Sequence, residues 1–349
     1  MKKLLSVLSG GLLCAAVSLF GLTGCNDDDP GNGGGSGKTV KVAWSVWTGW
    51  MPFKLMEKEG LLKKRCEELG VDVELVEFKG YMDSVSAFSA KKVDACAMTS
   101  MEALQPASSG VPTVAVIVND ISNGGDGLLV REGMDFASLK GQEIMLEQFS
   151  VSHYLLARAL EENGMSEADV TIKNIPGDDA GKAFLTDESV KAVTTWNPHL
   201  FLAQEGKKGI VLFDSSNIPG EIIDLLVFNG DLMKENPDAV KAVVLAWYDA
   251  MALIEGADTK EAAIATMAEG AGASVEEFKK MLGGTNLYTD SGKAVEFFKS
   301  ADLPETMKKI RAFSFKQELI TDEDFEIGFG ADSAALLKFD STFAEQIGN

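Results

Sequence analysis

The first half of the chain alternates short apolar runs with stretches whose apolar side chains recur at helical spacing. Residues 40–46 form an apolar run typical of a buried strand, and residues 51–69 carry the leucines and methionine of an amphipathic helix. Further strands are expected at 71–78, 93–98 and 113–118, with helices at 81–92 and 102–109. This alternation predicts a mostly parallel β-sheet that is covered by helices on both faces.

A glycine-rich break at residues 124–127 separates this alternation from a second one. The second one predicts strands at 128–130, 143–146, 170–175, 192–195, 210–213 and 222–229, and helices at 153–163 and 180–185. Asn236 and Pro237 then mark the start of a long helix, and the remaining chain is mainly helical in pattern.

The length of the chain predicts more than one hydrophobic core, because single cores stop growing near about 250–300 residues. We therefore predict an α/β protein with two lobes, arranged as a two-hinge clamshell. Lobe 1 is expected to comprise residues 39–122 and 227–349, and lobe 2 to be the inserted segment 123–226.

The N-terminus has the layout of a secretory signal, with Lys2 and Lys3 before an apolar run that ends in Leu22-Thr23-Gly24-Cys25. This ending resembles the lipobox of bacterial lipoproteins, which implies a signal peptide at 1–24 and a lipidated Cys25. The alternative is a spanning anchor, but serines and glycines dilute the run. Residues 25–38 have the composition of a flexible tether. The expected location is the extracytoplasmic side of the cell envelope (the periplasm), with the lipid as the membrane anchor.

Charge and rare residues exclude several classes of partner. The net charge of −21 argues against nucleic acid, which requires a basic surface. Cys66 and Cys96 are expected to be buried free thiols, although a disulfide is permitted in this compartment. The two histidines, His153 and His199, lack neighbours at metal-ligand spacing, so we expect no metal site and no cofactor.

In open α/β sheets the ligand lies beyond the carboxyl ends of the strands. The segments expected to face the cleft are 43–53, 79–84, 98–106, 118–127, 147–154, 195–199 and 217–224. Their only lysine is Lys79, and they contain no arginine. Their carboxylates are Asp83, Glu102, Asp120, Asp126, Glu147, Glu221 and Asp224.

A sulfonate or nitrate ligand would favour arginine, whereas a guanidinium group favours carboxylates and aromatic faces. The balance favours a small cation or amide, although helix N-termini can also bind an anion.

The candidate ligand-binding residues are the aromatic, hydroxyl, amide and acidic side chains of these segments. They are Trp47, Trp50, Tyr81, Thr99, Ser100, Glu102, Asp126, Glu147, Ser150, His153, Trp196, Asn197 and Glu221. Structural alternatives exist for several: Ser150 as a helix N-cap, His153 as a first-turn helix residue, and Asp126 and Glu221 as turn residues. Glu147, at a strand end in the second lobe, is the strongest single carboxylate candidate.

The first half contains VAWSVWTGWMP at 42–52, EGLLK at 59–63 and VDACAMTS at 93–100. Together these stretches resemble the nitrate/sulfonate/taurine class of periplasmic solute-binding proteins, which serve ABC importers. EQFSVSHYLL at 147–156, TWNPH at 195–199 and DSSNIPGEIID at 214–224 are similar to the subgroup associated with urea carboxylase systems. The resemblance implies a type II-like periplasmic-binding-protein clamshell, a ligand such as urea or guanidine, and an ABC permease partner in the cytoplasmic membrane.

The predicted function is therefore capture of a small nitrogenous solute by a monomer without catalysis, through hinge closure. One alternative is a binding protein for a small anion: an alkanesulfonate, taurine, nitrate or bicarbonate. A second is an enzyme, because a pyrimidine-synthesising family shares this fold class, but the sequence offers no G-x-S-x-G or H-E-x-x-H motif. A third is a structural or adhesion lipoprotein, which the two-lobed α/β pattern does not favour.

Overall fold

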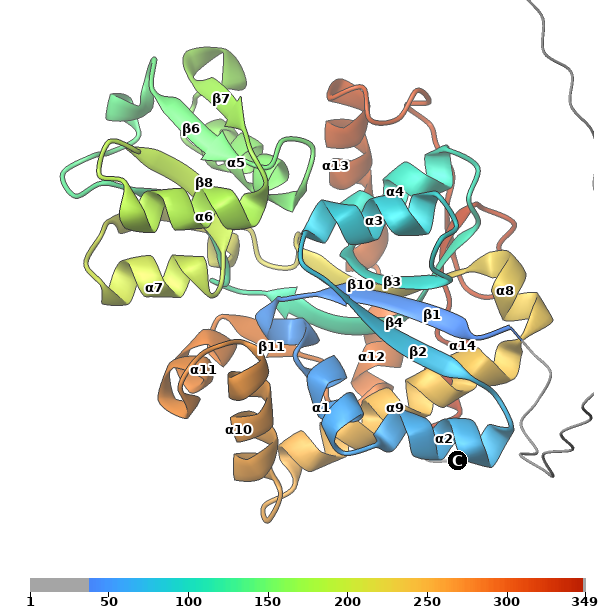
Figure 1. Ribbon diagram of the computed structural model, residues 1–349. Helices are drawn as coiled ribbons and strands as arrows, with labels where there is room; N and C mark the ends of the chain where they lie inside the picture. The colour runs from blue at the N-terminus through green and yellow to red at the C-terminus, as the bar shows by residue number, and fades with distance from the viewer. Residues whose placement is uncertain (1–37, 348–349) are drawn as a thin grey trace, which may run out of the picture. The chain divides into compact units, whose positions relative to one another are not determined.

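The larger of two β-sheets contains eight strands from both halves of the chain. The computed structural model describes residues 38–347 (Figure 1). The strand order is β12-β13-β4-β10-β3-β1-β2, with β11 paired to β4. The strands are β1 (Val40–Ser45), β2 (Val73–Phe78), β3 (Ala95–Thr99), β4 (Thr113–Ser122), β10 (Ile223–Asn229), β11 (Thr285–Leu287), β12 (Ile327–Phe329) and β13 (Leu337–Phe339).

The smaller sheet contains five strands in the order β7-β6-β8-β5-β9, coloured green in Figure 1. They are β5 (Asp126–Val130), β6 (Glu143–Leu146), β7 (Thr171–Asn174), β8 (Ala192–Trp196) and β9 (Ile210–Asp214). All five come from one continuous part of the chain, which is the segment expected to form lobe 2.

Helices cover both sheets, as the alternating pattern predicts. They are α1 (Pro52–Lys58), α2 (Leu61–Leu69), α3 (Tyr81–Ser89), α4 (Ser100–Ser108), α5 (Val151–Glu162), α6 (Gly177–Thr186), α7 (His199–Glu205), α8 (Gly230–Glu235), α9 (Pro237–Glu255), α10 (Lys260–Gly270), α11 (Val275–Leu282), α12 (Ser291–Phe298), α13 (Asp302–Lys316) and α14 (Thr342–Glu345). Single 3₁₀ turns lie at η1 (Thr48–Trp50), η2 (Ala137–Leu139), η3 (Glu167–Asp169) and η4 (Ser215–Asn217). The α/β clamshell class is confirmed by these two helix-covered sheets.

The long helix α9 supplies the centre of the larger core. Its start follows the predicted signal: the Asn236 side chain accepts a hydrogen bond from the Ala239 N–H, and Pro237 occupies the first turn. Trp247 of this helix is fully buried and its ring lies 5.0 Å from that of Phe53 in α1. Burial of rings of this size stabilises the fold by roughly 2–3 kcal/mol each.

Two local expectations require correction. The predicted helix at 51–69 is two helices, because Gly60 adopts a left-handed conformation (φ 65°) that interrupts it. The sheets are mixed rather than mostly parallel. Strand β10 runs antiparallel to β3 and β4, and β5 runs antiparallel to β8 and β9. Strand composition does not encode this direction, which follows from how the chain crosses between the sheets.

The chain passes between the sheets twice, at residues 123–125 and 215–222, which we call the crossing segments. The two crossing segments contact each other: the Ser215 hydroxyl lies 2.8 Å from that of Ser122 and accepts a hydrogen bond from the Gly124 N–H at 2.7 Å. These segments lie close to the predicted lobe boundaries, which remain a prediction.

Some of the remaining expectations concern residues that the structure describes, and others concern residues outside them. Cys66 and Cys96 are both buried and free, as expected. The signal peptide, Cys25 and nearly all of the tether lie outside the described residues. Within residues 38–347, no helix has the length and apolar character needed to cross a membrane, and no cluster of three or more potential metal ligands occurs there.

Candidate functional site

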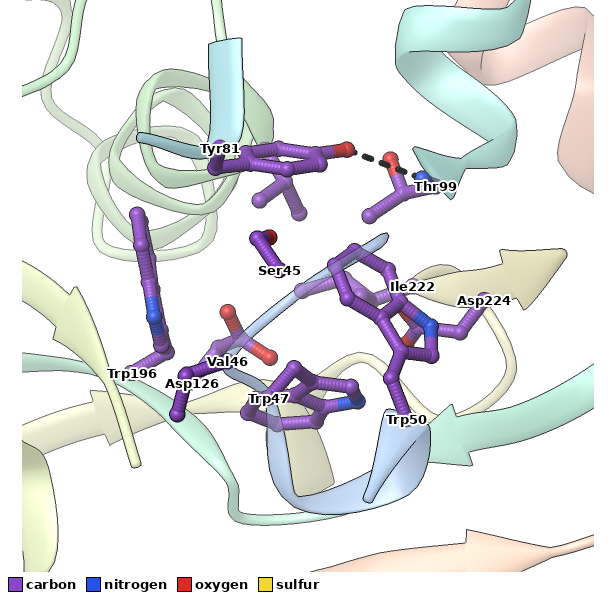
Figure 2. Close-up of a pocket in the computed structure, with 11 residues that line it drawn as sticks. Ser45, Val46, Trp47, Trp50, Tyr81, Thr99, Asp126, Trp196, Ile222 and Asp224 are labelled. Carbon is purple, nitrogen blue, oxygen red and sulfur yellow. Dashed lines mark hydrogen bonds between the residues drawn. The ribbon is translucent and has the colours of Figure 1, made fainter. Parts of the chain in front are cut away.

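A small pocket lies where residues of both sheets meet, at the ends of β1, β3 and β8 (Figure 2). It is lined by Ser45, Val46, Trp47, Trp50, Tyr81, Thr99, Asp126, Val151, Trp196, Ile222 and Asp224. The cavity enclosed between them is about 20 Å³ in volume. Since a cavity needs about 10–15 Å³ to hold one water, the pocket as it stands suits only a very small ligand.

Four aromatic rings form the walls of this pocket. Trp47 precedes the turn η1 after β1 and Trp50 ends it, Tyr81 begins α3, and Trp196 ends β8. The Tyr81 ring centroid lies 5.5 Å from that of Trp50 and 6.1 Å from that of Trp196. Figure 2 shows the rings around a common space, toward which the Asp126 carboxylate points. Ring faces around a small cavity can hold a cation or a flat polar molecule.

Two glycines allow the close approaches that build these walls. A Cβ at Gly177 would lie 2.0 Å from the Trp196 ring, and one at Gly49 would lie 1.8 Å from an oxygen of Asp120. Neither glycine has a positive φ, so it is the space, and not the backbone conformation, that requires glycine here.

Two carboxylates lie in register at the floor of the site. In the larger sheet, Asp224 of β10 pairs with Asp120 of β4 on one side and with Thr99 of β3 on the other. The Trp47 Nε1–H donates to both oxygens of Asp120, at 3.2 and 3.3 Å. Burial raises the pKa of both carboxyls. The charge of Asp120 raises the pKa of Asp224 further, whereas the hydrogen bond with Asp224 lowers that of Asp120, because two buried carboxyls that interact share a proton rather than ionise together.

Asp126 is the third buried carboxylate, and it comes from the smaller sheet. Its Oδ2 accepts a hydrogen bond of 2.6 Å from the Ser122 hydroxyl, the same serine that joins the crossing segments. Burial raises the pKa of Asp126 to about 7; the Ser122 hydrogen bond opposes this rise and the charge of Glu102 adds to it. A cation in the pocket would favour the ionised form.

The side chains with a formal charge that line this pocket are all acidic. None of the lining side chains is Lys, Arg or His, while Asp126 and Asp224 are 4% and 2% exposed. Buried carboxylates without a cationic partner are costly, and they are expected to bind a ligand that supplies the missing positive charge or several N–H donors.

Six of the thirteen predicted site residues line the pocket: Trp47, Trp50, Tyr81, Thr99, Asp126 and Trp196. Glu102 lies directly behind the wall and bonds two lining residues, the Thr99 hydroxyl and the Val151 N–H. Ser100, in the first turn of α4, is buried but is not among the lining residues.

The structure places the other predicted residues in supporting contacts outside the lining. Ser150 caps α5, and the Asn197 Oδ1 accepts a hydrogen bond from the Phe201 N–H at 3.0 Å. Glu147 accepts one from the Gly177 N–H at 3.2 Å, at the start of α6. Burial raises the pKa of Glu147 to about 7, an effect that this hydrogen bond opposes.

Two predicted residues join helix α5 to α13 instead of facing the pocket. The His153 Nε2 lies 2.5 Å from Glu167, whose other oxygen accepts a hydrogen bond from Gln317, directly after α13. Glu221 contacts the Arg158 Nε at 2.8 Å and the Lys309 Nζ at 2.6 Å. Burial acts to raise the pKa of Glu221, but these partners hold it below its usual value. Its charge is therefore already neutralised.

The lining residues missed by the sequence prediction are Ser45, Val46, Val151, Ile222 and Asp224. All five belong to the segments expected to face the cleft or border them, and Asp224 was among the counted carboxylates. The three apolar residues among them carry no polar group that would mark them as ligand contacts in the sequence. Asp224 could have been selected from its position at the start of a long apolar strand, where a carboxylate is unusual.

Comparison with known proteins places the chain in a family. The family described as NMT1/THI5 like matches residues 65–255, more than half of the chain. The chain belongs to the NMT1/THI5-like family. No curated protein matches the chain.

Solved structures with this fold belong to proteins of different function. The periplasmic aliphatic sulphonate binding protein SsuA from Escherichia coli superposes with a TM-score of 0.67 at 20% identity, covering 82% of this chain and 95% of that one. The periplasmic nitrate-binding protein NrtA from Synechocystis PCC 6803 gives 0.64 at 14%, covering 81% and 82%. The desulfurization enzyme DSZB gives 0.55 at 15%, covering 81% and 94%. These likenesses establish the periplasmic-binding-protein fold of this NMT1/THI5-like protein but not its ligand.

Replacing Gly177 by alanine is expected to weaken ligand binding by about 5- to 30-fold, the equivalent of roughly 1–2 kcal/mol for one aromatic contact. The added Cβ overlaps the Trp196 ring, while the N–H that bonds Glu147 is retained. Titration calorimetry measures the effect. Gly292→Ala on α12, whose Cβ would meet only Asp290 at 3.1 Å, is the control. Unchanged affinity in Gly177→Ala would show that Trp196 does not contact the ligand.

Proposed function

We propose that this protein is the substrate-binding component of an ABC importer and that its ligand is guanidinium or urea. The observation that carries this proposal is the pocket itself, whose four aromatic rings surround buried carboxylates with no cationic side chain among the lining residues. A planar guanidinium offers N–H donors in pairs to carboxylates and a cationic face to the rings. Urea offers the same planar donors without the charge.

The proposed mechanism is closure of two lobes around the ligand. The lobes are residues 39–122 with 227–349, and residues 123–226. Trp196 and Asp126 come from the smaller sheet, while Ser45, Thr99 and Asp224 come from the larger one. A ligand that contacts both sheets stabilises the closed form by its differential affinity for that form. The monomeric closed form would then dock on a permease, and no chemical step is needed.

A small-anion ligand is the second candidate, and the printed functions of the sulfonate- and nitrate-binding structural neighbours favour it. Alkanesulfonate, taurine, nitrate or bicarbonate would need hydrogen-bond donors in the pocket. Its donors are the Trp, Tyr, Ser and Thr side chains and backbone N–H groups, and the two lining aspartates oppose a negative ligand in their ionised forms. We therefore rank an anion below a cation or amide.

The deciding experiment is a thermal-shift screen of the purified protein, followed by calorimetry of each hit. The ligands are guanidinium, urea, taurine, methanesulfonate, nitrate and bicarbonate. A ligand at a hundred times its dissociation constant stabilises the folded state by about 2.7 kcal/mol. Stabilisation by guanidinium or urea supports the proposal. Stabilisation by an anion alone refutes the proposed ligand and favours the second candidate.

We further propose that the protein is held on the extracytoplasmic side of a membrane by lipid on Cys25. Cys25→Ser is expected to move the protein from the membrane fraction to the soluble fraction of fractionated cells, because the lipid supplies the anchor. Cys66→Ser, which changes a buried thiol, is the control and should stay in the membrane fraction. If Cys25→Ser remains with the membranes, the anchor lies elsewhere.

A further inference from the structure

Glu102 is a fully buried carboxylate held between the two sheets, directly behind the pocket. It lies in the first turn of α4, which follows β3 of the larger sheet. Its Oε1 accepts a hydrogen bond of 2.7 Å from the Val151 N–H, and its Oε2 accepts one from the Thr99 hydroxyl. Both partners line the pocket, so the charge of Glu102 lies one residue behind its wall.

Val151 is the first residue of α5, a twelve-residue helix that packs on the smaller sheet. The start of a helix carries free N–H groups and a partial positive charge, and it favours an anion. Here the anion is a side chain of the protein, contributed by a helix of the other sheet. Ser150 bonds the next N–H of α5, that of Ser152, so the two acceptors together occupy the first N–H groups of this helix.

Among residues 38–347, the contacts of the Glu102 carboxylate are hydrogen-bond donors and include no cation. Burial raises the pKa of Glu102, and the hydrogen bonds from Thr99, Tyr81 and Val151 oppose that rise. None of the groups that determine its pKa is a lysine, arginine or histidine. When Glu102 is ionised, none of these groups neutralises its negative charge, which then acts on the pocket that lies one residue away.

We propose that Glu102 is a specificity-determining residue: it occupies the anion position at the start of α5 and reserves the pocket for cationic or neutral ligands. The inference rests on the proposed function, in that the pocket must bind a small solute. An anion entering the pocket would meet this charge, and that of Asp126 when Asp126 is ionised, whereas guanidinium gains from both.

Gln105 provides a matched control for the charge. It lies one turn further along α4, and its Nε2 donates a hydrogen bond of 3.1 Å to the Phe149 carbonyl, in the turn before α5. Gln105 thus connects the same two helices as Glu102 but carries no charge. Loss of this bond changes the packing of α4 against α5, which should change the affinity for every ligand by the same factor.

The test measures dissociation constants of the full-length protein for guanidinium, urea, nitrate and methanesulfonate by titration calorimetry. Glu102→Gln keeps an oxygen for the Val151 N–H and removes the charge. We expect it to weaken guanidinium binding and to strengthen anion binding by about 100-fold each, the effect of a unit charge roughly 6 Å away at an effective dielectric constant near 20, so that the ratio of the two affinities changes by about 10,000-fold in favour of the anion. Gln105→Ala should shift all ligands together and leave the ratio within about threefold. Glu102→Asp, which keeps the charge, should retain the wild-type preference. This variant still tests the inference if Glu102→Gln does not fold.

An unchanged ratio in folded Glu102→Gln, or loss of the cation preference in folded Glu102→Asp, overturns the inference. A wild-type protein that binds none of the cationic or neutral probes refutes the proposed function instead. In that case Glu102→Gln still decides the inference, because nitrate binding that it gains over the wild type supports the role of Glu102, and no gain overturns it.

Discussion

Replacing Asp126 by asparagine is expected to weaken guanidinium binding by about 30- to 1,000-fold, or roughly 2–4 kcal/mol, the range found when one partner of a buried charge pair is removed. Asp126 is the lining carboxylate whose ionisation is most accessible at neutral pH, because its pKa is about 7. Asparagine has the same shape and can still accept the hydrogen bond from Ser122. The variant therefore removes the charge while keeping the pocket.

Titration calorimetry with guanidinium and urea checks this expectation. Urea carries no charge, so its affinity should fall much less than that of guanidinium. Asp83→Asn is the matched control: it removes a carboxylate from an exposed position on α3, in another segment expected to face the cleft, and should leave both affinities unchanged. Wild-type affinity for guanidinium in Asp126→Asn would remove Asp126 from the binding site.

Lowering the pH from 8 to 5 is expected to weaken guanidinium binding by roughly 100-fold. Guanidinium itself stays charged, since groups of this type titrate above about 12. Protons compete with the ligand for Asp126, whose pKa is about 7 in the unliganded protein. Affinity should therefore be nearly constant above pH 8 and fall about tenfold for each pH unit below 7.

The other titratable groups around Asp126 determine how steep this dependence is. They are Glu102 from α4, Asp120 from β4, Asp224 from β10 and Tyr81 from α3. The raised pKa of the Asp120 and Asp224 pair means that guanidinium can release a second proton there, which would steepen the fall. Calorimetry in buffers of different ionisation enthalpy counts the protons released. A flat profile for guanidinium would contradict the acidic site, and an anionic ligand would show the opposite slope.

Sequence reasoning succeeded where local pattern decides structure. Residues 40–45 of the predicted apolar run 40–46 form β1, residues 143–146 form β6, and Asn236 with Pro237 begins α9. The local sequence pattern does not encode the direction or the register of a strand. Strand β10 lies antiparallel between β3 and β4 because the chain enters it from the other sheet, and no run of residues reveals that return.

The same limit applies to the site. The aromatic residues after β1 and β8 could be selected because strand ends carry ligand sites in such sheets. Which carboxylates face inward depended on partners far away in sequence: Glu221 is neutralised by Arg158 and Lys309, whereas Asp224 meets Asp120 through strand register. Gly177 is required because of a ring nineteen residues later in the chain, Trp196, and its role follows only from the packing of α6 on β8.

The aromatic walls of the pocket have an optical consequence. The chain has five tryptophans, of which Trp47, Trp50 and Trp196 line the pocket, while Trp44 and Trp247 are fully buried elsewhere in the core. Indole emission responds to nearby charge and to water. A ligand that enters among these three rings, or a proton that settles on Asp126 beside them, changes the surroundings of most of the fluorophores in the protein. Intrinsic fluorescence is thus a direct reporter of pocket occupancy, with no label attached.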